Sequence, residues 1–175
     1  MSGHSKWSKI KHQKAVTDVK KSKIFTKLVR NISVEAKKAK GDRNAPGLRL
    51  AIEKARQANM PGDNVERAID KASASAEMER ILYEAYGPGG VAILIDTLTD
   101  SRNRTNQEIK HLLAKHGGSA AGPGAASWAF AKNADGVYEP TSTVDLSDEE
   151  LSSLALLVEA LEEYDDVQDV FTNAA

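Results

Sequence analysis

Lysine is concentrated at the start of the sequence, between Gly3 and Asn31. A cluster of ammonium groups attracts phosphates and releases the counterions that condense on a nucleic acid. The segment is therefore predicted to hold a phosphodiester backbone through its basic side chains. These are Lys6, Lys9, Lys11, Lys14, Lys20, Lys23, Lys27 and Arg30.

Two rings lie among these cations, Trp7 and His12. Exposed rings stack on unpaired bases, so both are candidates for stacking on RNA or single-stranded DNA. The alternative is that Trp7 covers the core of a helical bundle and that the lysines only keep this bundle in solution. Mixed charge signs are normal on a passive surface, so the clustering of one sign favours a binding role.

A second basic group, Arg102, Asn103 and Arg104, lies where a predicted strand leads into a predicted helix. The helix dipole disfavours a cation in the first turn by about 0.3 to 1 kcal/mol, so a partner is expected. A phosphate bound by the two guanidinium groups and the free helix amides is one candidate partner. An ion pair with Asp100 or Glu108 is the other, and the sequence leaves both open.

Residue patterns for catalysis or metal binding are missing from the sequence. There is no cysteine, and His111 and His116 are five positions apart, which puts them on different sides of a helix. The glycines at 87–90 and 117–124 lack the lysine and hydroxyl of a phosphate loop. We therefore expect no catalytic residues, no metal site and no cofactor, and we expect that the protein is not an enzyme.

Charge is distributed unevenly along the chain. The first 40 residues contain 12 Lys or Arg and 2 Asp or Glu, whereas residues 137–175 contain none and 11, within a net charge of −1. Such asymmetry indicates a polyanionic partner. As a hypothesis, the acidic end limits indiscriminate binding or folds back on the basic end.

Location is inferred from segments that the sequence lacks. No apolar run reaches membrane-spanning length, so a cytoplasmic protein without a membrane partner is expected. An organelle transit peptide is the alternative reading of the basic start, but such peptides favour Arg over Lys.

The first part of the chain predicts a helical bundle. Apolar residues recur at helical spacing over Ile24–Ile32, Leu48–Ala55 and Val65–Ala72. Asp63 and Glu66 have the spacing of a capping box at the start of the third helix. We expect a basic helical domain over residues 1–75.

The remainder predicts a mixed domain over residues 76–175, with an acidic C-terminal helix. Strands are expected over 80–86, 91–99, 126–132, 137–144 and 167–172, a helix after 99 that stops at Gly117, and a helix capped by Ser147 and Glu150. From residue 91 the order is βαββαβ. The predicted class is α+β, with a ferredoxin-like domain that has one extra N-terminal strand.

Seven blocks of this sequence resemble the signature blocks of the YebC/PmpR family, which includes the mitochondrial translational activator of cytochrome c oxidase. They are residues 3–7, 23–28, 59–61, 63–69, 86–90, 98–105 and 115–118. The blocks occur in the family's order. Members of the family usually carry a further small domain, inserted between the two strands that Asn133–Gly136 join here, and the sequence lacks it. Any function of that domain is in doubt for this chain.

The resemblance implies a nucleic-acid-binding regulator of gene expression. Some members are described as DNA-binding transcriptional regulators, whereas others are ribosome-associated factors that bind large-subunit ribosomal RNA and relieve stalls at proline-rich stretches. The residues themselves favour a structured RNA, because Lys outnumbers Arg in the basic segment and no base-reading helix is evident. DNA and ribosomal RNA, with the large ribosomal subunit, both stay open as partners.

Overall fold

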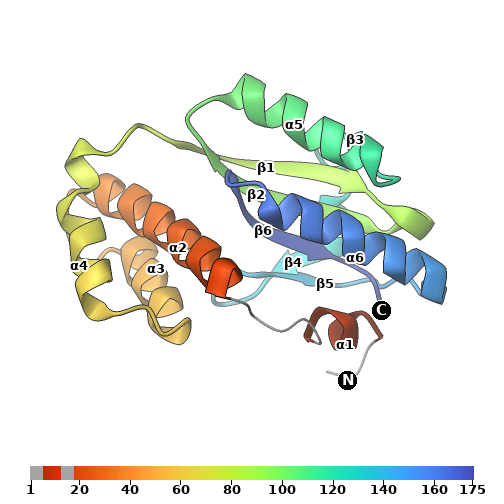
Figure 1. Cartoon of the computed structure of the whole chain (residues 1–175), viewed down its shortest axis with the longest axis horizontal. Helices are drawn as coiled ribbons and strands as arrows, with labels where there is room; N and C mark the ends of the chain where they lie inside the picture. Colours follow the sequence, from red (N-terminus) through yellow and green to blue (C-terminus); the bar gives the residue numbers. More distant parts are fainter. Residues whose placement is uncertain (1–5, 13–17) are drawn as a thin grey trace. The chain divides into compact units, whose positions relative to one another are not determined.

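The structure is a computed structural model that describes residues 6–12 and 18–175. Contacts within the described chain define two compact units, one of residues 18–79 and one of residues 6–12 with 80–175 (Figure 1). The expected division into residues 1–75 and 76–175 stays a prediction about folding domains.

The first unit consists of helices. They are α2 (Asp18–Lys38), α3 (Pro46–Gln57), α4 (Gly62–Asp70) and the short 3-10 helix η1 (Ala72–Ala74). Helix α2 packs against both α3 and α4, and their apolar stripes meet around Ile32, Leu48 and Ala55, which are fully buried. The three helices predicted from apolar spacing are confirmed, and α2 is longer than its predicted apolar stripe.

One predicted capping interaction in this unit is wrong. Helix α4 begins after Pro61 without any side-chain cap, so Asp63 and Glu66 do not form the expected capping box. Glu66 instead pairs with Arg43, whose Nη1 lies 2.8 Å from Glu66 Oε1. Because the helix starts at Gly62 with Pro61 as its N-cap, Asp63 lies inside the first turn and does not occupy the N-cap position that a capping box requires.

The second unit combines helices and strands. Its helices are α1 (Lys6–His12), α5 (Arg102–Lys115) and α6 (Asp148–Glu163), with 3-10 helices η2 (Pro88–Gly90) and η3 (Ser127–Ala129). Its strands are β1 (Glu79–Tyr86), β2 (Ala92–Thr99), β3 (Ser119–Ala121), β4 (Phe130–Lys132), β5 (Tyr138–Pro140) and β6 (Val167–Thr172). The predicted α+β class is confirmed.

The sheet topology corrects the ferredoxin-like prediction. The main sheet has the order β3-β1-β2-β6, so β1, predicted to be an extra strand, lies inside the sheet. Strands β4 and β5, predicted to belong to the same sheet, pair only with each other. The short β3 was not predicted. It pairs with β1 in antiparallel register, with Ala85 opposite Ala120.

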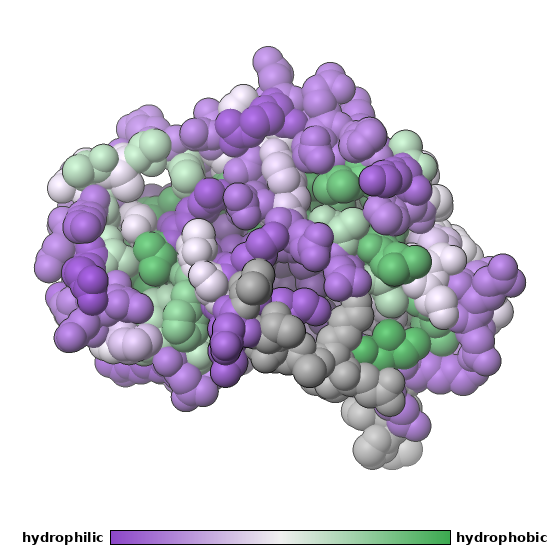
Figure 2. Space-filling view, in the orientation of Figure 1, coloured by the Kyte–Doolittle hydropathy of each residue, from purple (hydrophilic) through white to green (hydrophobic). Residues whose placement is uncertain are grey.

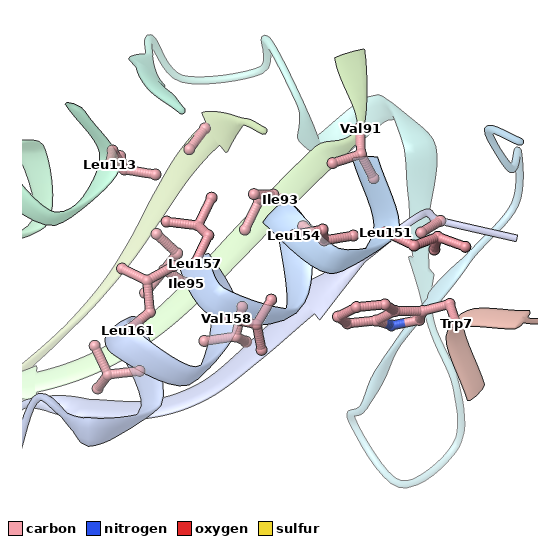
Figure 3. Close-up of a cluster of buried hydrophobic side chains, with 14 of the residues drawn as sticks. Trp7, Val91, Ile93, Ile95, Leu113, Leu151, Leu154, Leu157, Val158 and Leu161 are labelled. Atoms are coloured by element: carbon pink, nitrogen blue, oxygen red, sulfur yellow. The ribbon is translucent and has the colours of Figure 1, made fainter. Parts of the chain in front are cut away.

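Both faces of the main sheet are covered, as the consecutive apolar residues 92–95 at the start of β2 require. On one face, Ile93 and Ile95 pack against α5 and α6 (Figure 3). On the other face, Ala92 and Leu94 pack against η3 and Phe130 at the start of β4. Strand β2 therefore runs between two apolar clusters.

Local signals at the ends of α5 and α6 are confirmed. Ser147 accepts from the Glu150 amide at 3.2 Å and Glu150 accepts from the Ser147 amide at 2.8 Å, which is the capping box. Gly117, with φ of 76°, follows α5 and lets the Gly118 amide bond Leu113 O at 2.8 Å. Both helices thus start or stop where the sequence indicates.

Strands β4 and β5 are joined by a tight turn through residues 133–137. Asn133 N donates to Val137 O at 2.9 Å, and the Asn133 side chain accepts from the Asp135 and Val137 amides. Gly136 takes the positive φ of 75° that the turn needs. No inserted domain separates these strands in this chain.

Candidate nucleic-acid interface

Helix α2 supplies the largest group of described cations. Its 21 residues contain seven Lys or Arg and two Asp or Glu. Four of the predicted contact residues lie on it, together with the neighbouring Lys21; they are Lys20, Lys23, Lys27 and Arg30. Lys21 is exposed, while Lys20, Lys23, Lys27 and Arg30 are half-buried and also interact within the protein. The helix is thus a cationic surface on which a phosphate would compete with internal partners.

The basic surface of the first unit includes residues that the sequence analysis did not select. Arg49 and Arg56 are exposed on α3, seven positions apart and therefore almost in line along the helix. Lys38 is exposed at the end of α2. Hydrophilic residues also dominate the surface seen in Figure 2. The seven-residue spacing of the two arginines was the signal that could have identified them.

Helix α1 carries three of the lysines that the sequence predicts to contact phosphate. Lys6, Lys9 and Lys11 are exposed, and Lys6 Nζ lies 3.2 Å from Asp148 Oδ1 with both side chains largely in solvent. Such an exposed pair contributes little stability and leaves the lysine available. Lys14 lies outside the described residues, as does the side chain of His12.

Trp7 has a packing role in place of the expected stacking role. It is 9% exposed and belongs to the same apolar cluster as Leu151 and Leu154 of α6 (Figure 3). Its amide donates to Ala175 O at 3.2 Å, so α1 also contacts the end of the chain. An indole covered in this way does not offer a face to a base. The sequence could not show this, because the contact joins residues more than 140 positions apart.

The predicted group at the start of α5 is adjacent in the structure, but one of its two cations, Arg104, has internal partners. All three residues, Arg102, Asn103 and Arg104, are exposed. Arg104 Nη2 lies 2.7 Å from Asp100 Oδ1 and 2.9 Å from Asp166 Oδ2. Of the two alternatives left open, the ion pair with Asp100 is therefore present, joined by Asp166. The hydrogen bonds that Arg104 donates to Asp166 and Asp100 raise its pKa and keep its positive charge.

Asp166 is the centre of this network. Its carboxylate is 7% exposed and accepts bonds from Arg104, from Thr105 Oγ1 at 2.7 Å and from Tyr164 Oη at 3.0 Å. Burial alone would raise the pKa of Asp166, but the donors outweigh it and lower the pKa to about 2. Ser101 caps α5 by accepting from the Arg104 amide at 3.4 Å. The start of α5 is therefore held by groups of the protein itself.

Searches for two other kinds of site gave no candidate in the described part of the chain. Residues 6–12 and 18–175 contain no group of three or more His, Cys, Asp or Glu side chains arranged to bind a metal ion. None of the helices described there is long and apolar enough to cross a membrane.

These features define a protein with a basic helical unit and an α+β unit whose polar residues are largely paired internally. The TACO1/YebC protein N-terminal domain matches residues 5–75, and the TACO1/YebC second and third domain matches residues 78–137 and 131–174. The chain belongs to the TACO1/YebC family.

Relatives of the chain differ in how much of their length it covers. A "Probable transcriptional regulatory protein" of Fervidobacterium nodosum is 47% identical over 171 residues, which are 95% of this chain and 68% of that protein. A protein of the same name from Thermosipho africanus is 54% identical over 134 residues, 74% of this chain and 53% of that protein. The matched part of the chain thus spans 68% of the length of the first relative and 53% of the second.

Two further comparisons extend over almost the whole chain. A "Probable transcriptional regulatory protein" of Pseudothermotoga lettingae is 37% identical over 236 residues, covering 99% of this chain and 93% of that protein. That alignment is longer than the 175 residues of this chain, so the relative carries additional residues within the matched region. The crystal structure of a conserved hypothetical protein from Aquifex aeolicus superposes with a TM-score of 0.79 and 32% identity, covering 98% of this chain and 97% of that one.

Proposed function

We propose that this protein is a nucleic-acid-binding regulator of gene expression that acts in the cytoplasm. The observation that carries the proposal is the composition of α2, with seven basic and two acidic residues on one helix. The names of the relatives, probable transcriptional regulatory proteins, support a regulatory role. In this proposal α2 and the exposed lysines of α1 hold the phosphodiester backbone, and no catalytic step is involved.

Duplex DNA is the first proposed target, in line with the names of the relatives. Large-subunit ribosomal RNA, in a factor that relieves stalls at proline-rich stretches, is the second. The composition of α2 favours the second target, because six of its seven cations are lysines. Lysine acts on phosphate as a point charge, whereas arginine also reads guanine with its planar fork.

Sedimentation of cell extract on a sucrose gradient separates the two targets. Comigration with large ribosomal subunits, lost at high salt, is expected for the ribosomal role. A free protein with a reproducible promoter footprint is expected for transcriptional control. In parallel, the purified protein should be retained on heparin and on RNA in dilute buffer, and the absence of retention on both would refute nucleic-acid binding altogether.

A further inference from the structure

Trp128 is the most exposed large apolar side chain of the described residues. It is 61% exposed, whereas the second tryptophan of the chain, Trp7, is 9% exposed. Trp128 belongs to η3, directly before β4. Packing in the α+β unit does not account for so much indole in solvent.

The polar edge of the Trp128 ring is fixed within the protein. Its Nε1 donates to Ala125 O at 3.0 Å and to Tyr86 Oη at 3.1 Å. Tyr86 Oη also donates to Ala125 O, so the three groups form a closed set. The indole orientation is therefore set before any ligand arrives.

The loop that carries Trp128 is itself held in place by Glu84. This carboxylate accepts from the amides of Gly124 and Ala126 at 2.7 Å and from that of Ser127 at 2.8 Å. Burial alone would raise the pKa of Glu84, but the three amide bonds lower it, so the carboxylate stays charged. Because this charged carboxylate holds three amides within four residues of the loop, the ring has a rigid support.

With its N–H already used, Trp128 offers a partner only the carbon surface of its 61% exposed indole. A partner must therefore recognise a flat π surface without a hydrogen bond to the indole. A proline-rich peptide that needs the indole N–H as a donor fits poorly, whereas an unpaired base stacks on any aromatic face.

We propose that Trp128 is a preorganised stacking platform for an unpaired nucleobase. The inference rests on the proposed nucleic-acid binding and extends it, since it places base contact at Trp128 and not at the predicted Trp7. Because the ring is already fixed, binding a base to it loses little conformational entropy. Stacking on the ring therefore adds affinity without depending on which base is bound.

Tryptophan emission tests the proposal, because the chain contains only two tryptophans. Single-stranded oligouridylate and oligoadenylate are titrated into the full-length protein, with heparin as a polyanion that lacks bases. The two oligonucleotides should quench the emission and heparin should not. In Trp128→Phe only the buried Trp7 emits, so the quenching should disappear while the oligonucleotide still binds by anisotropy of a labelled probe.

Oligonucleotide affinity tests the proposal independently of tryptophan emission. Trp128→Ala should weaken oligonucleotide binding by about 5- to 100-fold, and Trp128→Phe, which keeps a ring, should recover most of it. Heparin affinity should be the same in all three proteins.

The outcomes distinguish this inference from the proposed function. Unchanged oligonucleotide affinity in Trp128→Ala, with binding itself intact, overturns the stacking platform and leaves the regulator proposal standing. Failure of the wild-type protein to bind any polyanion overturns both. If the wild-type protein self-associates and Trp128→Ala does not, while oligonucleotides quench the emission of both proteins equally, the ring makes a contact between copies of the chain. That result would also overturn the inference.

Discussion

Helix α2 and the start of α5 are both rich in cations, yet they differ in how those cations are matched. Helix α2 has seven basic residues and two acidic ones in its own sequence. At α5, by contrast, Arg104 is matched by Asp100 from the preceding loop and by Asp166 from a segment 62 positions away. Before a cation in a sequence is assigned to a ligand, the anions that the fold brings to it must therefore be counted.

The largest effect should come from removing charge on α2. The triple change Lys23→Gln, Lys27→Gln and Arg30→Gln removes three proposed phosphate contacts. RNA affinity near physiological salt should fall on the order of 100-fold, and the slope of log K against log salt should flatten by about 2 to 3. Fluorescence anisotropy over a salt series measures both quantities.

A matched control removes the same charge from the other unit. Lys110→Gln, Lys115→Gln and Lys132→Gln change three exposed lysines of the α+β unit. This variant should keep most of the salt slope, because its three lysines are not among the proposed phosphate contacts. Equal losses in the two triple variants would mean that net charge, and not the α2 surface, governs binding.

The next effect concerns the anion that neutralises Arg104. Asp166→Asn should lower the free energy of unfolding by about 2 kcal/mol, because a buried carboxylate that accepts from Arg104, Thr105 and Tyr164 loses its charge. Urea denaturation monitored by circular dichroism gives the value. Asp100→Asn is the control: its carboxylate is 48% exposed, so the loss should stay below about 1 kcal/mol. Equal losses of stability in the two variants would show that Asp166 matters no more to this network than Asp100 does.

The same network predicts how stability depends on pH. The pKa of Asp166 is about 2 in the folded protein, against an ordinary value of 3.8. A lowered folded pKa stabilises above the unfolded value, so this contribution is complete above pH 3.8 and lost as the pH falls toward 2. Urea midpoints measured across this range should drop more steeply for the wild type than for Asp166→Asn, and parallel curves would contradict the assignment.

The smallest effect is expected for Arg104 in binding. Arg104→Gln should change RNA affinity by less than about twofold and leave the salt slope unaltered, since its charge is already matched. The same variant should lower stability, because Asp166 keeps its charge without its cation. A large loss of RNA affinity, with the fold intact, would restore the start of α5 as a phosphate site.

The sequence predicted what depends on local pattern. Helices with apolar stripes, the capping box at Ser147 and the glycine after α5 follow from neighbouring residues, and the structure has them. The three-residue strand β3 (Ser119–Ala121) has no period to detect, and its absence from the prediction led to the wrong sheet membership of β4 and β5. Pairing of strands is decided by contacts between distant segments, which a single sequence does not contain.

The same limit applies to the candidate site. The lysines of α1 and α2 were identifiable because charge clustering is visible in sequence order. The burial of Trp7 and the neutralisation of Arg104 depend on Leu151 and Asp166, which lie far along the chain. Trp128 was overlooked because its exposure, like the anchoring of its loop by Glu84, arises only from the folded arrangement.

Protection of individual lysines from acetylation tests the central claim most directly. The full chain is treated with a low dose of acetylating reagent, with and without bound RNA, and each modified lysine is quantified by mass spectrometry. The account predicts protection concentrated in α2, at Lys20, Lys21, Lys23 and Lys27, with Lys110 and Lys115 of α5 unprotected. Protection of α5 lysines with none in α2, or protection of neither helix by RNA that is demonstrably bound, would contradict it.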